Sequence, residues 1–84
     1  MEVRFLAAAL QDLSVLDASI IRRVVNRVER LVSNWEHVQP ESLSGDLSAL
    51  YKLRVGDYRV LYQILPDEEA ILIHQIGNRR EVYR

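Results

Sequence analysis

Hydrophobic residues recur at helical spacing through the first third of the chain. Alternate apolar positions over residues 3–5 predict a short strand, and the alanines and leucines of residues 6–13 predict a helix. After Asp17, a candidate N-cap, seven apolar residues cover an arc of about 140° around a second helix: Ile20, Ile21, Val24, Val25, Val28, Leu31 and Val32. The arginines on the opposite side predict a solvated helix face: Arg22, Arg23, Arg27 and Arg30.

The period of the pattern changes in the second half of the chain. Residues 34–46, with Pro40 and Gly45, predict a connection that has room for a helical turn. Residues 51–55, 58–65 and 70–76 are rich in strand formers, with turn signals at 56–57, 66–69 and 77–78. The pattern therefore predicts an α+β domain: two N-terminal helices packed on an antiparallel β-sheet meander, with a short N-terminal strand.

The composition is typical of one folded domain, residues 1–84. Hydrophobic residues make up 49% of the chain, which is too many for a disordered segment. The chain has no cysteine, so disulfide bonds and thiolate metal sites are excluded. No apolar run reaches the ~18–20 residues of a membrane span, and the first residues lack the basic start of a signal peptide. We therefore expect a cytoplasmic protein that has no membrane partner.

The total charge gives no support to nucleic-acid binding, because the net charge is −1 and the pI is about 6.1. The kind of basic residue is more informative. Lys52 is the only lysine among 11 basic residues, and the others are arginines. An arginine holds a phosphate with a planar fork of donors that a lysine lacks.

A two-residue hairpin loop at 56–57 would concentrate this charge. Arg54 would then lie opposite Arg59, and both would share one sheet face with Lys52. Like charges directly opposite each other repel. The pair is therefore either a solvated surface or a site for an anion, phosphate first. The segment 78–84 adds three arginines and a tyrosine directly after the last strand, which favours the anion site.

The second half of the chain resembles a known family. The runs YKLRVGDYRVLYQI and ILIHQIGNRREVYR, with the lead-in LSGDLSALYKLRV, are similar to the RelE branch of the RelE/ParE toxin superfamily. The resemblance extends over essentially the whole chain and implies the RelE-like microbial RNase fold. It also implies a toxin of a type II toxin–antitoxin system, neutralised by a cognate RelB-type antitoxin. Toxins of the RelE type enter the ribosomal A site and cleave the mRNA there, without a metal ion or cofactor.

The resemblance assigns roles to individual residues. It implies a catalytic set that consists of Lys52, Arg54, Arg59, Arg79 and Tyr83. Arg80 and Arg84 are expected to bind RNA, and Arg80 is also an alternative to Arg79 because the arginine is doubled. Two departures stand out: Asn78 replaces a histidine that many relatives have, and the pI is mildly acidic.

The chemistry that these residues would perform is attack of a ribose 2′-oxygen on the adjacent phosphate. Arg59 and Arg79 would stabilise the negative charge that grows on the phosphoryl oxygens. Lys52 or Tyr83 would transfer the protons, since an arginine stays protonated. Tyr83 could instead stack on a base.

Two other functions stay open at this point. One is a ParE-type inhibitor of DNA gyrase without nuclease activity, and the other is an RNase that needs no ribosome. We expect no direct DNA binding by this chain alone. The helix arginines could also contact ribosomal RNA or an acidic segment of the antitoxin.

Other candidate sites are weaker. His37 and His74 are distant in sequence, and His74 fits a packed or hydrogen-bonded residue of a strand better than a catalyst. The acidic residues 67–69 predict a solvated turn rather than a metal site.

Overall fold

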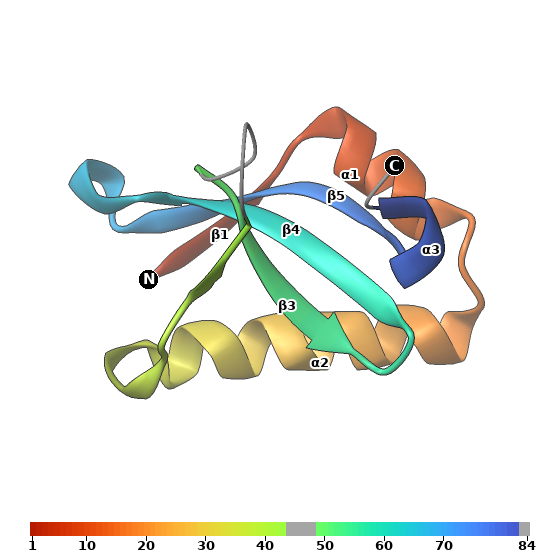
Figure 1. Cartoon of the computed structure of the whole chain (residues 1–84), viewed down its shortest axis with the longest axis horizontal. Helices are drawn as coiled ribbons and strands as arrows, with labels where there is room; N and C mark the ends of the chain where they lie inside the picture. The colour runs from red at the N-terminus through yellow and green to blue at the C-terminus, as the bar shows by residue number, and fades with distance from the viewer. Residues whose placement is uncertain (44–48, 83–84) are drawn as a thin grey trace.

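The computed structural model describes residues 1–43 and 49–82, which form one five-stranded sheet with helices (Figure 1). The elements in chain order are β1 Glu2–Phe5, α1 Ala7–Ser14, α2 Ala18–Ser33, the 3-10 turn η1 Trp35–His37, β2 Glu41–Ser42, β3 Tyr51–Val55, β4 Tyr58–Leu65, the 3-10 turn η3 Pro66–Glu68, β5 Ala70–Asn78 and α3 Arg79–Val82.

The sheet contains the predicted meander and two strands beside it. The strand order is β1-β5-β4-β3-β2, and β3, β4 and β5 pair antiparallel. The short N-terminal strand is present and pairs in parallel with β5, so that Glu2 lies opposite Ala70. The α+β class is confirmed, and the sheet is mixed because of this one parallel pair.

Both predicted N-terminal helices are present, each close to its predicted bounds. Asp17 occupies the N-cap position of α2, but its side chain makes no capping hydrogen bond. The connection after α2 contains the turn η1 and, unexpectedly, the two-residue strand β2. Residues 44–46 of the predicted connection lie outside the described residues.

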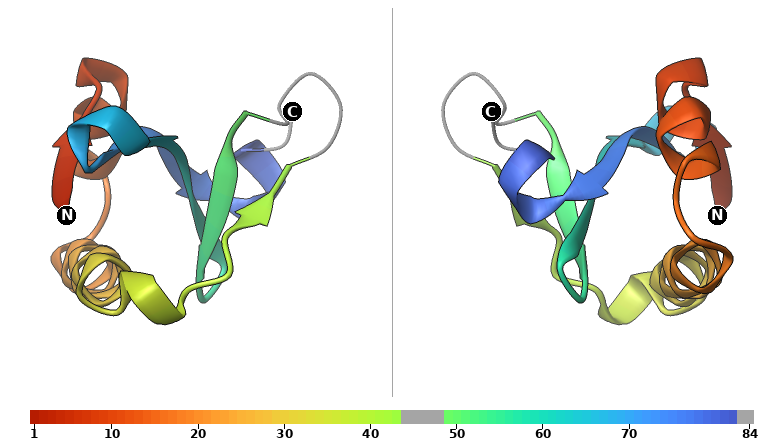
Figure 2. Two further views of the ribbon diagram at one scale, coloured as in Figure 1. Left: turned by 90° about the vertical axis from the view of Figure 1, so that its left-hand side faces the viewer. Right: turned by 90° about the vertical axis from the view of Figure 1, so that its right-hand side faces the viewer.

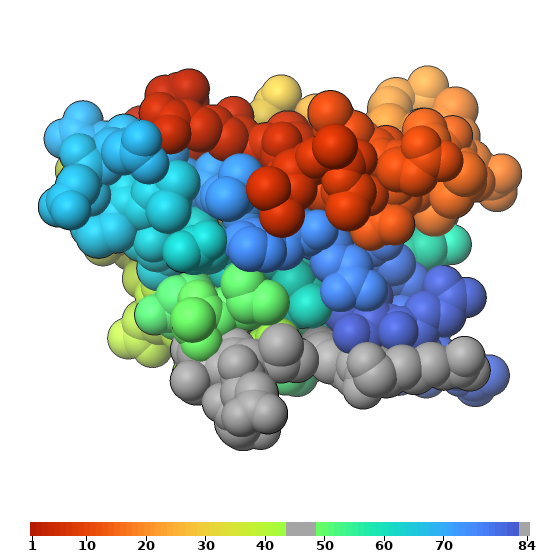
Figure 3. Space-filling model, turned by 90° about the horizontal axis from the view of Figure 1, so that it is seen from above, coloured from red at the N-terminus to blue at the C-terminus, as the bar shows by residue number. Residues whose placement is uncertain are grey.

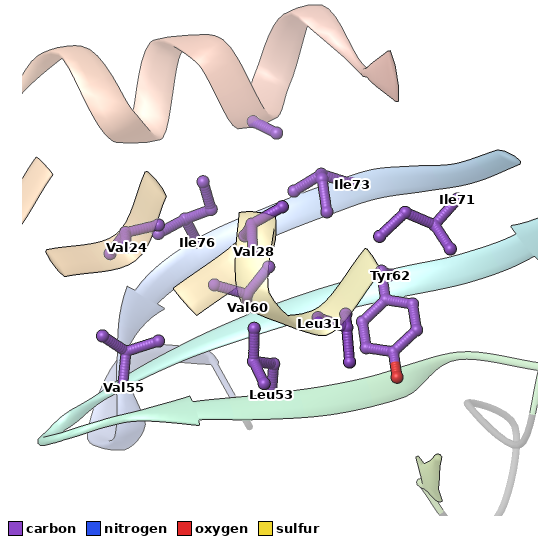
Figure 4. Packing of buried hydrophobic residues seen from close by; sticks show 11 residues of the cluster. Val24, Val28, Leu31, Leu53, Val55, Val60, Tyr62, Ile71, Ile73 and Ile76 are labelled. Carbon is purple, nitrogen blue, oxygen red and sulfur yellow. The ribbon is translucent and has the colours of Figure 1, made fainter. Parts of the chain in front are cut away.

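One hydrophobic core lies between the helices and the sheet. Figure 2 shows α1 and α2 on one side of the twisted sheet and α3 on the other. Figure 4 shows side chains of β3, β4 and β5 meeting those of α2 in this core. The buried members of the core are Ala9, Val24, Val28, Leu31, Leu53, Val55, Val60, Tyr62, Ile71, Ile73 and Ile76. Each fully buried aliphatic side chain contributes about 1.5–3 kcal/mol to folding, so this packing fixes which sheet face meets the helices.

An aromatic cluster closes one end of the core. The Tyr62 ring stacks on Tyr51 with ring centroids 5.8 Å apart, and Trp35 meets it edge-on at 6.5 Å. The Tyr62 side chain is only 1% exposed. Burial, with a smaller contribution from Tyr51, raises the pKa of Tyr62 to about 12.

The turn between β3 and β4 is the predicted two-residue loop. Gly56 has a φ of 60°, a left-handed conformation that glycine adopts without a steric penalty. Val55 pairs with Tyr58, Arg54 with Arg59 and Leu53 with Val60, so the predicted register is confirmed.

The helix α3 is anchored to the open side of the sheet, the side away from α1 and α2. The buried Val82 side chain packs on Gly77, where an added Cβ would lie 2.9 Å from Val82 Cγ2. The Arg79 backbone N–H donates to the Asp57 carbonyl oxygen at 2.8 Å. Figure 3 shows α1, in red and orange, along one side of β5. The dark blue α3 lies on the other side. The sequence pattern gave no indication of this helix.

In the described part of the chain, no helix is both long enough and apolar enough to cross a membrane.

The buried Tyr62 predicts a loss of stability at alkaline pH. Its pKa is about 12 in the folded chain and close to 10 when unfolded. Because the unfolded chain releases this proton first, the free energy of unfolding should fall by about 1.4 kcal/mol per pH unit between these values. Urea unfolding between pH 9 and 12 measures it. Tyr62→Phe should remove this part of the pH dependence, and an unchanged slope in that variant would contradict the assignment.

The contact between Gly77 and Val82 predicts a coupling between the two positions. Gly77→Ala should cost about 1–3 kcal/mol of unfolding free energy, because the new methyl group overlaps Val82 and displaces α3. The same substitution in a Val82→Ala background should cost much less, since the overlapping Cγ2 is gone. Urea unfolding of the double-mutant cycle tests this, and additive costs would show that the two residues do not touch.

Candidate functional site

Three basic side chains share the open face of the sheet. Lys52 and Arg54 alternate with the buried Leu53 along β3, and Arg59 lies directly opposite Arg54 on β4. Since side chains alternate between the two faces of a strand, these three point away from the helices. We call Lys52, Arg54 and Arg59 the basic face.

The Arg59 guanidinium is held by the hairpin turn. Its Nη1 donates to the carbonyl oxygens of Gly56 and Tyr58, both at 2.8 Å. Among the described residues, the Nη2 and Nε donors of Arg59 have no protein acceptor. The side chain is therefore oriented by the backbone and still has N–H groups for an anion.

Lys52 and Arg54 share one carboxylate. The Glu41 Oε1 atom of β2 lies 3.8 Å from Lys52 Nζ and 3.8 Å from Arg54 Nη2. Glu41 lies directly opposite Lys52 in the sheet. The Lys52 side chain is 22% exposed and that of Arg54 is 63% exposed, so both can be reached from solvent.

These contacts change the interpretation of the opposed arginines. The sequence left two interpretations of the repulsion between Arg54 and Arg59, a solvated surface or an anion site. In the structure Arg54 pairs with Glu41 and Arg59 binds carbonyl oxygens of the turn. The two guanidinium groups thus have separate partners, and no bound anion is needed to relieve their repulsion.

The C-terminal arginines begin at the end of the sheet that carries the β3–β4 turn. Arg79 and Arg80 start α3 directly after Asn78, which lies opposite Tyr58. Both arginine side chains are exposed. The Asn78 side chain accepts a hydrogen bond from the Arg80 N–H at 3.0 Å, so it caps the helix. The predicted site residues Tyr83 and Arg84 lie outside the described residues.

Two arginines of α2 lie close to the β3–β4 hairpin, and one of them departs from the predicted solvated face. Arg27 is half-buried, and its Nη2 lies 3.4 Å from the Arg54 carbonyl oxygen. Arg23 packs over the turn, where a Cβ on Gly56 would lie 2.6 Å from its Nη2. The prediction of a solvated face is confirmed for Arg22, Arg23 and Arg30, which are exposed, and is wrong for the half-buried Arg27, because this position of α2 lies against β3.

The weaker candidates stay outside the basic face. The half-buried His74 ring hydrogen-bonds Gln63 through Nε2 at 3.0 Å, which is the packed role that the sequence favoured. The turn at 66–69 is exposed, and Glu68 pairs with Arg4 at 3.0 Å. No cluster of three or more metal-ligating side chains occurs within residues 1–43 and 49–82.

Sequence reasoning missed Glu41. It lies in a two-residue strand that shows no alternation, and its partners are 11 and 13 positions away. Only the pairing of β2 with β3 brings this carboxylate to the basic face.

The arrangement fits the binding of a phosphate group. An oriented arginine, a lysine and a second arginine lie on adjacent strands, and two further arginines follow at the nearby end of β5. The ammonium group of a lysine such as Lys52 belongs to the chemical types that can transfer protons in catalysis. Tyr62 is excluded from this role, because it belongs to the core and its raised pKa keeps it protonated.

The chain matches the family described as "ParE toxin of type II toxin-antitoxin system, parDE" over residues 3–83. Toxin RelE of Mycobacterium tuberculosis is 34% identical over 98% of this chain and 84% of that protein. Putative toxin RelE1 of Methanocaldococcus jannaschii is 31% identical over 89% of this chain and 86% of that protein.

A solved structure supports the same relationship. It is the toxin–antitoxin complex RelBE2 of M. tuberculosis, in which a chain with 28% identity superimposes with a TM-score of 0.82. The match covers 93% of this chain and 96% of that one. The protein therefore belongs to the ParE toxin family of type II toxin–antitoxin systems and, by its relatives and its fold, is a toxin of the RelE type.

Proposed function

We propose that this toxin is an endoribonuclease that cleaves mRNA in the ribosomal A site and so stops translation in the cytoplasm. The observation that carries the proposal is Arg59. Two carbonyl oxygens of the turn orient it on an open face between the strand of Lys52 and Arg54 and the start of α3. A guanidinium with remaining donors in a fixed position fits the task of stabilising a phosphate in its transition state.

The proposed reaction balances without a further reagent. The ribose 2′-oxygen attacks the adjacent phosphorus and loses its proton to a base. The bond to the 5′-oxygen of the next nucleotide breaks, and this oxygen takes up a proton. The products are a 2′,3′-cyclic phosphate and a 5′-hydroxyl, and the step as written uses no metal ion or cofactor.

Individual residues have distinct roles in this proposal. Arg59 and Arg79, or Arg80 in its place, stabilise the charge on the phosphoryl oxygens, each donor contributing about 3 kcal/mol. Arg54 holds the phosphate, and Lys52 or Tyr83 transfers the protons. Arg80 and Arg84 bind the neighbouring RNA.

We further propose that a RelB-type antitoxin neutralises the toxin. The RelBE2 complex of M. tuberculosis pairs a related toxin with its antitoxin. A RelE–RelB complex of Pyrococcus horikoshii contains a second related toxin, with 26% identity and a TM-score of 0.72 over 96% of this chain and 97% of that one. An antitoxin that covers the basic face would keep RNA away from it.

A second function stays in view because the matching family is named after ParE. ParE-type toxins inhibit DNA gyrase and need no residues that act on RNA. The discriminating result is whether purified toxin cuts a translated message or blocks gyrase supercoiling.

The central prediction concerns Arg59. Translating ribosomes with a defined message and the purified toxin should give cuts at the A-site codon, read by primer extension. Arg59→Ala should lower the cleavage rate by about 100-fold or more, because an oriented donor to the phosphate is lost. Its affinity for the antitoxin should stay within about tenfold, which serves as the folding control.

Three outcomes would contradict this prediction. Cleavage that survives Arg59→Ala would remove Arg59 from the site. Cleavage of naked RNA would show an RNase that needs no ribosome. Inhibition of gyrase without any cleavage would favour the ParE-type function.

Glu41 gives a second prediction, because its carboxylate occupies the place between Lys52 and Arg54 that a phosphate would take. Glu41→Gln should tighten RNA binding about two- to fivefold, since an exposed ion pair contributes about 0.2–1 kcal/mol. Fluorescence anisotropy with a 2′-O-methyl RNA, which has no 2′-hydroxyl to react, measures the affinity.

Glu68→Gln is the matched control for Glu41→Gln. It makes the same change in net charge and also breaks an ion pair with an arginine, Arg4. Equal effects of the two substitutions would mean that only the net charge matters. Weaker RNA binding by Glu41→Gln would mean that Glu41 positions Lys52 and Arg54 for RNA.

A further inference from the structure

Part of the outer edge of β3, next to the basic face, is not paired with another strand. β2 pairs with Tyr51 and Lys52, and no strand of residues 1–43 and 49–82 pairs with the outer edge of residues 53–55. The helix α2 lies against β3 (Figure 1). Arg27 of α2 contacts the Arg54 carbonyl oxygen. Arg27 thus reaches the outer edge of β3 from the helix side, at the residue whose side chain belongs to the open face.

Three arginines of α2 form a stripe beside this edge. Arg23, Arg27 and Arg30 follow at intervals of four and three residues, which places them in one row on a helix. We call them the arginine stripe. Together with Asn26, Val55 and Gly56 they line a groove of about 330 Å³.

A second groove continues the first. It has a volume of about 230 Å³, and its lining includes Arg27, Lys52 and Arg54. Because Arg27 lines both grooves, they meet at this residue. The two grooves therefore lie on either side of Arg27, along a path around the edge of β3 from the basic face to Arg23 and Arg30.

The charge along this path is almost unopposed. Within the described residues, no arginine of the stripe makes an ion pair with a carboxylate. Glu41 is the one carboxylate among the residues that line the two grooves. Like charges three or four positions apart destabilise a helix. Within the fold, Arg27 donates to the Arg54 carbonyl oxygen and Arg23 packs over the turn.

The groove fits a phosphate backbone better than a protein segment. Arginine is the residue that holds phosphate oxygens with a two-pronged fork. Apolar anchors in pockets dominate protein–protein binding. Val55 is the only apolar side chain that lines the groove of the stripe, and Leu31, Leu53 and Tyr62 of the second groove are buried in the core. We propose that the arginine stripe binds phosphate groups of the RNA. These phosphates would neighbour, in the same strand, the phosphate held by the basic face. This inference rests on the proposed function.

The test compares arginines on two sides of the same helix. Arg30→Gln and the double variant Arg27→Gln/Arg30→Gln remove charge from the stripe. Arg22→Gln removes the same charge from an exposed position that lines neither groove. Arg30 makes no side-chain hydrogen bond to the sheet in the described chain, so its substitution leaves the contacts of the fold intact.

Binding of a 2′-O-methyl RNA 12-mer is measured by anisotropy at several salt concentrations. Each lost phosphate contact should lower the slope of log K against log salt by about 0.7. The double variant should bind about tenfold or more weakly at low salt, and Arg30→Gln should fall between it and the wild type. Arg22→Gln should match the wild type in affinity and slope.

Three results would overturn the proposal. One is no binding of the RNA by the wild-type toxin, and another is equal loss of affinity in Arg22→Gln and Arg30→Gln. The third is weaker antitoxin binding by Arg30→Gln together with unchanged RNA binding, which would make the stripe a protein interface.

Cleavage on ribosomes separates this inference from the proposed function. Suppose that the wild type cleaves no mRNA and that the stripe variants bind RNA more weakly than it does. This result would support RNA binding by the stripe and refute the proposed nuclease activity. Normal cleavage with unchanged RNA binding in the stripe variants would refute the stripe and leave the nuclease standing. If both hold, the stripe variants should need more ribosomes for half-maximal cleavage and keep the same maximal rate.

Discussion

The two-residue turn at Gly56 and Asp57 determines which side chains of β3 and β4 face the helices. A slip of one residue in this pairing would turn every buried side chain of a strand toward solvent and every basic one toward the core. The left-handed conformation of Gly56 and the burial of Leu53, Val55 and Val60 enforce the same register. The basic face is therefore on the surface because burial of the apolar side chains on the opposite face of the sheet is favourable.

The turn also organises the rest of the site. The Gly56 carbonyl oxygen holds the Arg59 guanidinium, and the Asp57 carbonyl oxygen receives the N–H of Arg79. One short loop thus orients an arginine of β4 and fixes the start of the helix that carries two more. The close packing of Val82 on Gly77 then holds that helix against the sheet.

The local grouping of charged residues in this toxin is more informative than its net charge. The net charge is −1, yet the basic face, the start of α3 and the arginine stripe surround one end of the sheet. The ion pairs of Glu2 and Glu68 with Arg4 lie elsewhere, beside β1 and the turn after β4. A local excess of arginines can favour an anion in one region of a protein whose net charge does not, although Glu41, Asp57 and Glu81 lie in the same region.

The sequence by itself determined the elements and the two faces of the hairpin. The alternation of residues 51–55 and 58–65, the apolar arc of α2 and the turn at 56–57 are local patterns, and local backbone geometry decides their outcome. The grouping of Lys52, Arg54 and Arg59 followed from that register. Only the tertiary structure decided the parallel pairing of β1, the place of Glu41 and the position of the arginine stripe. A helical pattern gives angles around its own axis, and a two-residue strand has no period. Which neighbour such residues meet is set by how the distant segments pack together.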